Sequence, residues 1–175
     1  IMERIKSISR VMGWLLKLGI YLTALGFIVS AILIILAPNS GNFSIGQFKI
    51  PVNQLTAGTK IILIISASLI YAVFLYALIS LKKLFALYEQ GKVFDEANVK
   101  YMKAFSYSII MYAFLKSIIL VSISIVIAIS TSGQNSLNIS LFEELPTLII
   151  GIIFLIISMI MDEARKLKQE QDLTI

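Results

Sequence analysis

The residues of this chain that could do chemistry are few, and Lys116 is the sharpest candidate. It stands inside a long apolar block, "AFSYSIIMYAFLKSIILVSISIVIAIS", and an ionisable side chain at membrane depth needs a partner or a function. The apolar blocks contain no acidic residue, so the expected partners are hydroxyl groups such as that of Tyr112, backbone carbonyls, water or a ligand. The simpler alternative is that Lys116 extends its amino group to the inner membrane surface and has no further role.

Other kinds of reactive site are missing from the sequence. The chain has no cysteine and no histidine, which excludes thiolate or imidazole metal sites, cysteine nucleophiles and any Ser-His-Asp triad. Its ten acidic residues show no spacing that suits acid–base catalysis. We therefore expect a protein that is not an enzyme, with no catalytic residues, no metal and no cofactor.

The elements that must position Lys116 are apolar helices. Of the 175 residues, 58% are hydrophobic and 14% are charged, whereas a soluble domain has about 25% charged residues. Crossing the hydrocarbon takes about 20 apolar residues in a helix, and the sequence has four suitable blocks. They are Trp14–Ala37, Ile61–Leu81, Ala104–Ser130 and Pro146–Met161. The sequence thus predicts an all-α integral membrane fold, an antiparallel bundle of four transmembrane helices in a single domain, 1–175. We expect the helices over about 12–37, 60–90, 95–131 and 146–168.

The distribution of Lys and Arg predicts how the chain is oriented. Of the 15 Lys and Arg residues, only Lys49 and Lys60 fall in the two outer segments between the blocks (expected loops 38–59 and 132–145, with Lys60 directly after the first), and Lys116 lies within a block. All the others gather in the N-terminal segment, the central insert and the tail. Since cytoplasmic segments carry the excess of positive charge, we expect a multi-pass protein of the cytoplasmic membrane with both termini inside the cell.

The first outer loop contains a pattern typical of a small β-hairpin. In "NFSIGQFKIPV" apolar residues alternate on both sides of Gly46-Gln47, and such a pair suits a two-residue turn. An irregular loop on the membrane surface is the alternative.

The only long polar stretch between the blocks, "LYEQGKVFDEANVK", is typical of a tight reversal between two helices. Gly91 stands where a left-handed residue ends a helix, and Asp95 is a good N-cap for the next one. Phe94 is placed to pack on Val99 as a hydrophobic staple, and Asn98 is a weak capping-box partner. We expect the reversal at 91–94, facing the cytoplasm.

The same stretch carries a resemblance. "LYEQGKVFDEANV" and the ending "DEARKLKQEQDLTI" resemble the signature and the tail of domain of unknown function 2975, a family of small four-helix bacterial membrane proteins. The family often has Ser or Thr where this chain has Asp95, which caps a helix equally well. The resemblance carries no agreed activity. It implies a partner, because the family's members resemble partners of small helix-turn-helix transcription regulators.

From these observations we expect a regulatory or sensory membrane protein that acts in signalling and transcription regulation. A cytoplasmic platform of residues 1–13, 83–103 and 162–175 would bind the helix-turn-helix regulator. The residues expected to contact it are Tyr88, Gly91, Phe94, Asp95 and Asn98. The other expected partner is the lipid bilayer, without direct contact to nucleic acid, and a homo-oligomer is compatible with the sequence. The alternative is a small transporter, channel or membrane ligand-binding subunit with an interior site near Lys116 and Tyr112.

Overall fold

The structure, a computed structural model, describes residues 2–36, 42–45, 48–51, 57–93, 95–130 and 144–173. In chain order the elements are α1 (Met2–Leu36), β1 (Asn42–Ile45), β2 (Phe48–Pro51), α2 (Ala57–Glu89), α3 (Glu96–Ser130) and α4 (Leu145–Leu173). Each of the four helices contains a stretch that is long and apolar enough to cross a membrane. The prediction of four membrane-spanning helices is therefore confirmed at this level.

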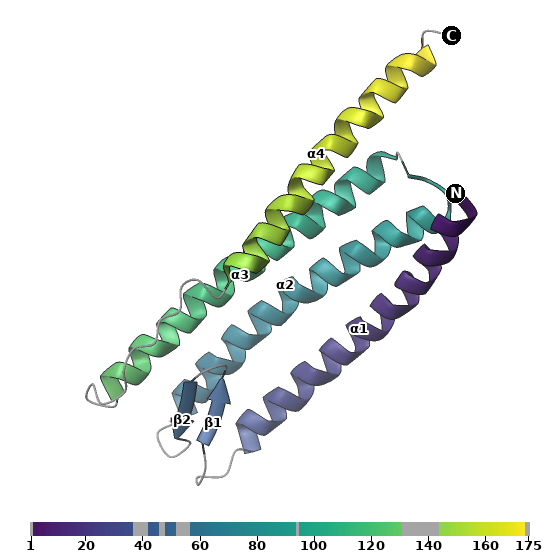
Figure 1. Cartoon of the computed structure of the whole chain (residues 1–175). Helices are drawn as coiled ribbons and strands as arrows, with labels where there is room; N and C mark the ends of the chain where they lie inside the picture. The colour runs from purple at the N-terminus through teal and green to yellow at the C-terminus, as the bar shows by residue number, and fades with distance from the viewer. Residues whose placement is uncertain are drawn as a thin grey trace.

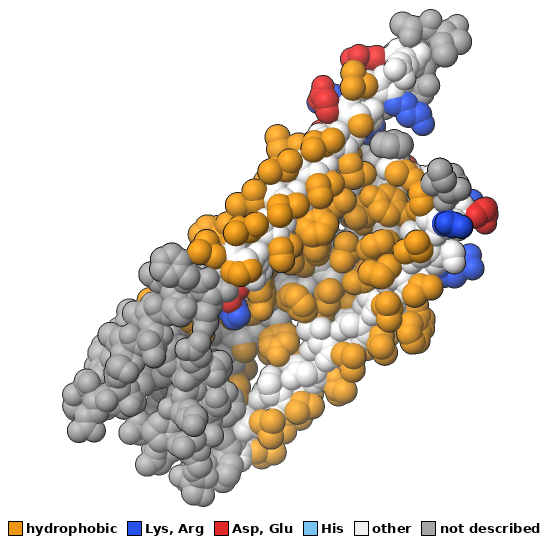
Figure 2. Space-filling model, viewed as in Figure 1, with side chains coloured by type: hydrophobic (Ala, Val, Ile, Leu, Met, Phe, Trp, Pro, Cys, Tyr) orange, Lys and Arg blue, Asp and Glu red, His pale blue; other side chains and the backbone are white. Residues whose placement is uncertain are grey.

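The helices pack on their neighbours in chain order: α1 on α2, α2 on α3 and α3 on α4 (Figure 1). Within the described residues, α4 makes no comparable contact with α1 or α2. The bundle is thus an open row, in which α4 packs mainly on α3. Hydrophobic side chains cover the length of the helices (Figure 2), and many large ones are exposed, among them Leu25, Ile62 and Ile153. An apolar surface of this extent suits contact with lipid.

Both chain termini and the reversal between α2 and α3 lie at one end of the row (Figure 1). We call this the basic end and define it by residues 2–13, 82–103 and 162–173. Here α1 begins at Met2, well before the expected position 12. The apolar block alone suggested the later start, whereas the helix continues through the charged residues before it. Arg10 Nε donates to Glu89 Oε1 of α2 over 2.8 Å, which ties this early part of α1 to the end of α2.

The loop between α1 and α2 carries the two strands. They pair antiparallel, with Ile45 opposite Phe48 and Phe43 opposite Ile50. This register leaves two residues between the strands, as a two-residue connection requires. The expected Gly46-Gln47 turn itself lies outside the described residues. So do residues 132–143 of the expected second outer loop.

A glycine allows α4 to approach α3 closely. A Cβ atom added at Gly151 would lie 2.7 Å from Ile110 Cγ1 and 3.2 Å from the Ile110 backbone nitrogen. Next to this crossing, the rings of Phe105 and Phe154 meet edge to face with centroids 5.0 Å apart. Small residues are common where membrane helices cross, because they let the backbones come together. Gly151 is therefore the point about which α3 and α4 are packed.

Candidate functional site

The reversal at the basic end begins with a complete helix C-cap. The N–H of Lys92 donates to the Leu87 carbonyl and the N–H of Gly91 donates to the Tyr88 carbonyl, both over 3.0 Å. Gly91 has a φ of 77°, a left-handed conformation that side chains with a Cβ rarely adopt. These bonds form the Schellman motif, so the prediction that Gly91 ends the helix in a left-handed conformation is confirmed.

Helix α3 then begins with the expected N-cap. Asp95 Oδ1 accepts a hydrogen bond from the Ala97 N–H over 3.2 Å, and the Asp95 carbonyl accepts one from the Asn98 N–H over 3.0 Å. The carboxylate thus satisfies one of the free N–H groups at the helix start. Val99 is buried, but its expected staple partner Phe94 lies outside the described residues.

Asn98 has a role that the capping rules did not predict. Its side chain is fully buried, and Nδ2 donates to the carbonyls of Lys92 and Val93, the second over 2.8 Å. The buried amide therefore links two backbone carbonyls of the reversal and fixes the shape of the reversal. Any contribution of Asn98 to a partner acts through that shape, because its amide group is not accessible.

Tyr88 joins the reversal to the last helix. Its ring packs edge-on against Phe85 with centroids 6.0 Å apart, and its hydroxyl donates to Met161 Sδ of α4 over 3.9 Å. Tyr88, Gly91, Asp95 and Asn98, which the sequence singled out together, are thus brought to one place.

A groove of about 750 Å³ lies between the reversal and α4. We call it the basic-end groove; Lys92, Asp95, Glu96, Arg165 and Lys168 contribute charges of both signs to its lining.

An ion-pair network fixes one wall of this groove. Lys103 Nζ donates to Asp162 Oδ2 over 3.2 Å, and Arg165 donates to Asp162 Oδ1 over 3.2 Å. A second guanidinium nitrogen of Arg165 lies 4.0 Å from Glu96 Oε2. Asp162 directly follows the apolar block Pro146–Met161 of α4. The hydrogen bonds from Lys103 and then from Arg165 hold its pKa below the usual value.

Lys116 has a carboxylate partner, which corrects two expectations. Its amino group forms an ion pair with Glu144, whose side chain is only 8% exposed. The last apolar block was expected to begin at Pro146, so Glu144 fell in the expected outer loop 132–145 and was not considered as a partner of Lys116. Glu144 stands at the end of α4 that is remote from the basic end. The Lys116 amino group therefore does not extend toward the basic end, as the simpler alternative expected.

The start of α4 explains why an acidic residue stands there. The Glu144 carbonyl accepts the Leu148 N–H over 2.9 Å, so Glu144 is the N-cap residue and the helix N-terminus favours its negative charge. Pro146 falls in the first turn, where its missing N–H costs no hydrogen bond.

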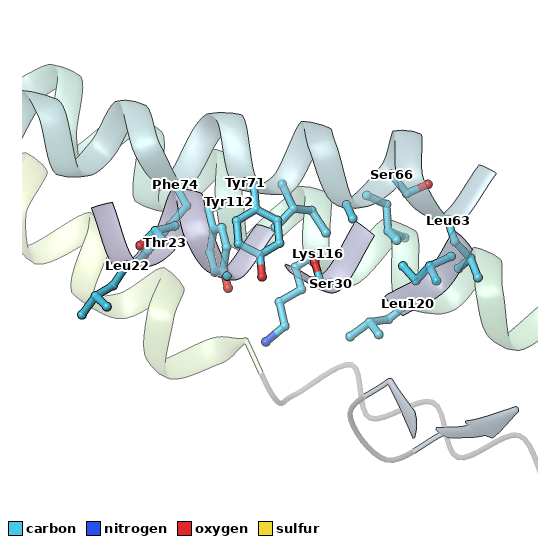
Figure 3. Close-up of a pocket in the computed structure, with 15 residues that line it drawn as sticks. Leu22, Thr23, Ser30, Leu63, Ser66, Tyr71, Phe74, Tyr112, Lys116 and Leu120 are labelled. Carbon is cyan, nitrogen blue, oxygen red and sulfur yellow. The ribbon is translucent and has the colours of Figure 1, made fainter. Parts of the chain in front are cut away.

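Lys116 also lines a second groove, of about 760 Å³, between α1, α2 and α3. We call it the α1–α3 groove. Most of its lining is apolar, with hydroxyl groups from Tyr71, Tyr112 and Ser66 among others. The Tyr112 ring packs on Phe74, with centroids 5.5 Å apart. Figure 3 shows the hydroxyl groups of Tyr71 and Tyr112 pointing to the side of the groove to which the Lys116 amino group extends.

A family model described as "Protein of unknown function (DUF2975)" matches residues 46–175. The chain belongs to the DUF2975 family. The matched segment contains the reversal, the Lys116–Glu144 ion pair and helices α2 to α4, whereas α1 precedes it. No curated protein and no solved structure matches the chain.

This DUF2975 chain therefore carries two candidate sites that differ in their relation to the family. All helical segments that shape the reversal fall inside the matched segment. The α1–α3 groove takes Thr23, Ser30 and other lining residues from α1, whereas the basic-end groove takes Ile5 from it. Within the described ranges, no group of three or more Asp or Glu residues is arranged to hold a metal ion.

Proposed function

We propose that this protein is an integral membrane protein that regulates transcription by binding a small helix-turn-helix regulator at its basic end. The observation that carries the proposal is the basic-end groove beside a rigid reversal. It is the more polar of the two grooves, and Gly91 and Asp95, two of the residues that the family resemblance singles out, line it.

The orientation that this function needs follows from the charges. Apart from Lys17, Lys49, Lys60 and Lys116, every Lys and Arg residue lies at the basic end. Because positively charged segments stay on the cytoplasmic side, the basic end faces the cytoplasm, where a transcription regulator is found.

The groove suits a protein partner better than nucleic acid. A phosphate backbone is bound through cations, whereas this lining combines Lys92, Arg165 and Lys168 with the carboxylates of Asp95 and Glu96. Leu167 of α4 is 54% exposed and adds an apolar side chain that a protein partner can contact. The bonds from Asn98 and the network around Asp162 hold the surface in place before binding, which lowers the entropic cost of association.

The test is co-expression of the tagged protein with the helix-turn-helix regulator encoded beside its gene, followed by purification in detergent. We expect the regulator to be retained, and the double variant Lys92→Glu, Lys168→Glu to lose it. Both side chains are exposed, so the double variant should fold. Lys82→Glu is the matched control, since Lys82 is exposed at the same end but does not line the groove.

Two results would contradict the proposal. One is a neighbouring gene that encodes no such regulator; the other is a regulator that the unaltered protein fails to retain, or that all three proteins retain equally.

A second candidate function, a membrane ligand-binding subunit, is favoured by the α1–α3 groove. Its volume of about 760 Å³ is within the range of small-molecule sites, and it combines apolar walls with an ion pair. The two functions are compatible, because the grooves use different residues.

A further inference from the structure

The Lys116–Glu144 ion pair lies toward the end of the apolar part of the molecule that is remote from the basic end. Lys103, which pairs with Asp162, marks the inner limit of the apolar part of α3. From Lys103 to Lys116 the helix rises about 20 Å, at 1.5 Å per residue. Along α4, the 18 residues from Asp162 to Glu144 rise about 27 Å, so the pair stands in the outer third of a hydrocarbon core about 30 Å thick.

An ion pair at this depth calls for an explanation beyond stability. Removing two charges from water costs about as much as their attraction returns, and apolar side chains of similar size often stabilise as well or better. Ionisable groups in membrane spans are expensive and usually functional. Lys116 is both a member of this pair and part of the lining of the α1–α3 groove, so whatever enters the groove meets the pair.

We propose that the α1–α3 groove binds a long-chain carboxylic acid, whose carboxylate replaces that of Glu144 on the Lys116 ammonium. This rests on the ligand-binding candidate above and is independent of the helix-turn-helix regulator.

The charge balance of the exchange selects a weak acid. The ligand enters from the bilayer as the neutral acid, and its proton passes to the Glu144 carboxylate. The ligand carboxylate then pairs with Lys116, and Glu144 becomes a neutral carboxylic acid. The site holds one positive and one negative charge before and after. A phosphate ester already carries a negative charge, so even if a remaining proton passed to Glu144 it would add an uncompensated negative charge in the membrane.

The groove offers separate surroundings for the two ends of such a ligand. Toward its outer part the walls are apolar side chains of three helices, including Ile34, Leu63 and Leu120, which suit an acyl chain. The hydroxyl groups of Tyr71 and Tyr112 point to the same side as the Lys116 amino group (Figure 3). They are placed to donate hydrogen bonds to a head group held there.

The exchange also links the groove to α4. Glu144 is the residue at which α4 begins, and loss of its ion pair frees that end of the helix. The contact at Gly151 and the network around Asp162 still hold α4 to α3. The far end of α4 forms one wall of the basic-end groove.

The experiment is equilibrium binding of radiolabelled palmitic acid to the purified full chain in nanodiscs. We expect saturable binding that unlabelled palmitic acid displaces and that hexadecanol, with the same chain and no acid group, does not. Phosphatidylglycerol and lysophosphatidic acid, the phosphate amphiphiles, should not displace it either.

Two variants test the ion-pair exchange. The double variant Lys116→Met, Glu144→Gln is neutral and similar in volume, so it should fold, and we expect its affinity for palmitic acid to fall about tenfold or more through loss of a charge-assisted contact. Glu144→Gln alone leaves Lys116 without its competing carboxylate, so this variant should now bind lysophosphatidic acid as well. Lys17→Met, a change of an exposed lysine of α1 outside the groove, should bind palmitic acid normally.

The proposal is overturned if the unaltered protein does not bind palmitic acid, if hexadecanol displaces it equally well, or if the double variant binds with unchanged affinity. A Glu144→Gln variant that still rejects lysophosphatidic acid overturns the charge-balance argument. Because no regulator is present in this assay, its failure would leave the proposed regulatory function standing, and the co-purification test would not decide ligand binding.

Discussion

At the scale of single residues, buried polar groups shape both candidate sites. Asn98 holds two carbonyls of the reversal with one amide, and Glu144 holds Lys116. The predictable part of this chemistry was local. Gly91 and Asp95 were found from the sequence because a helix cap is formed within a few residues of chain. The partners of Asn98 and Lys116 depend on how the chain folds back, and neither spacing nor hydropathy records that.

Asn98→Asp should destabilise the protein by about 1–3 kcal/mol, the cost of leaving buried polar groups unsatisfied. The change keeps the size of the side chain but replaces the donating amide by a group that only accepts, facing two carbonyls. Thermal unfolding in detergent measures the effect. Asn53→Asp, a change at a position distant in sequence from the reversal, provides the comparison, and equal unfolding temperatures for the two variants would contradict the role assigned to Asn98.

Gly91→Ala should lower the free energy of unfolding by about 1–2 kcal/mol, because an L-residue pays that amount in the left-handed conformation. The matched control is Gly19→Ala in α1, where an added Cβ meets nothing within 4 Å. A helix gains about 0.5–1 kcal/mol from such a change. The two alanine variants should therefore shift the unfolding temperature in opposite directions, and a stabilised Gly91→Ala variant would show that the C-cap is not formed.

At the scale of elements, hydropathy located the four helices but not all of their ends. Block boundaries placed the start of the first helix near position 12, yet α1 begins at Met2, because a helix at the membrane surface continues through charged residues where they find partners such as Glu89. The expected start of the last helix, at Pro146, was one residue from the observed start of α4 at Leu145. Because Glu144 was assigned to a loop, however, it was not recognised as the partner of Lys116. The crossing at Gly151 was not predicted, since a glycine in an apolar block does not reveal which helix it faces.

Gly151→Ala should destabilise the α3–α4 contact by about 1–3 kcal/mol, the usual cost of overpacking. The new Cβ would stand 2.7 Å from Ile110 Cγ1, and the 3.2 Å distance to the backbone nitrogen limits how far the side chain alone can relieve the clash. Thermal unfolding in detergent is the measurement and Gly13→Ala the control, since a Cβ at Gly13 meets nothing within 4 Å. If both variants unfold at the same temperature as the unaltered protein, α4 does not cross α3 at this glycine.

At the scale of the whole molecule, the four helices form an open row with both termini at one end. The number of helices followed from length and composition. Their arrangement did not, because lipid accepts any apolar face and the sequence pattern does not say which faces meet another helix. The open row leaves the α1–α3 groove accessible, and the up-and-down order of the helices places the reversal beside the end of α4. Both proposals depend on the helices crossing the bilayer, and the regulatory one also needs the basic end in the cytoplasm.

The most direct test of this claim is cysteine labelling in intact cells. The chain has no cysteine, so the variants Lys92→Cys and Lys49→Cys each carry a single thiol. We predict that a membrane-impermeant maleimide labels Lys49→Cys from outside and reaches Lys92→Cys only after the cells are permeabilised. Labelling of Lys92→Cys in intact cells, with Lys49→Cys protected, would contradict the account, because the basic end would then face away from every cytoplasmic partner.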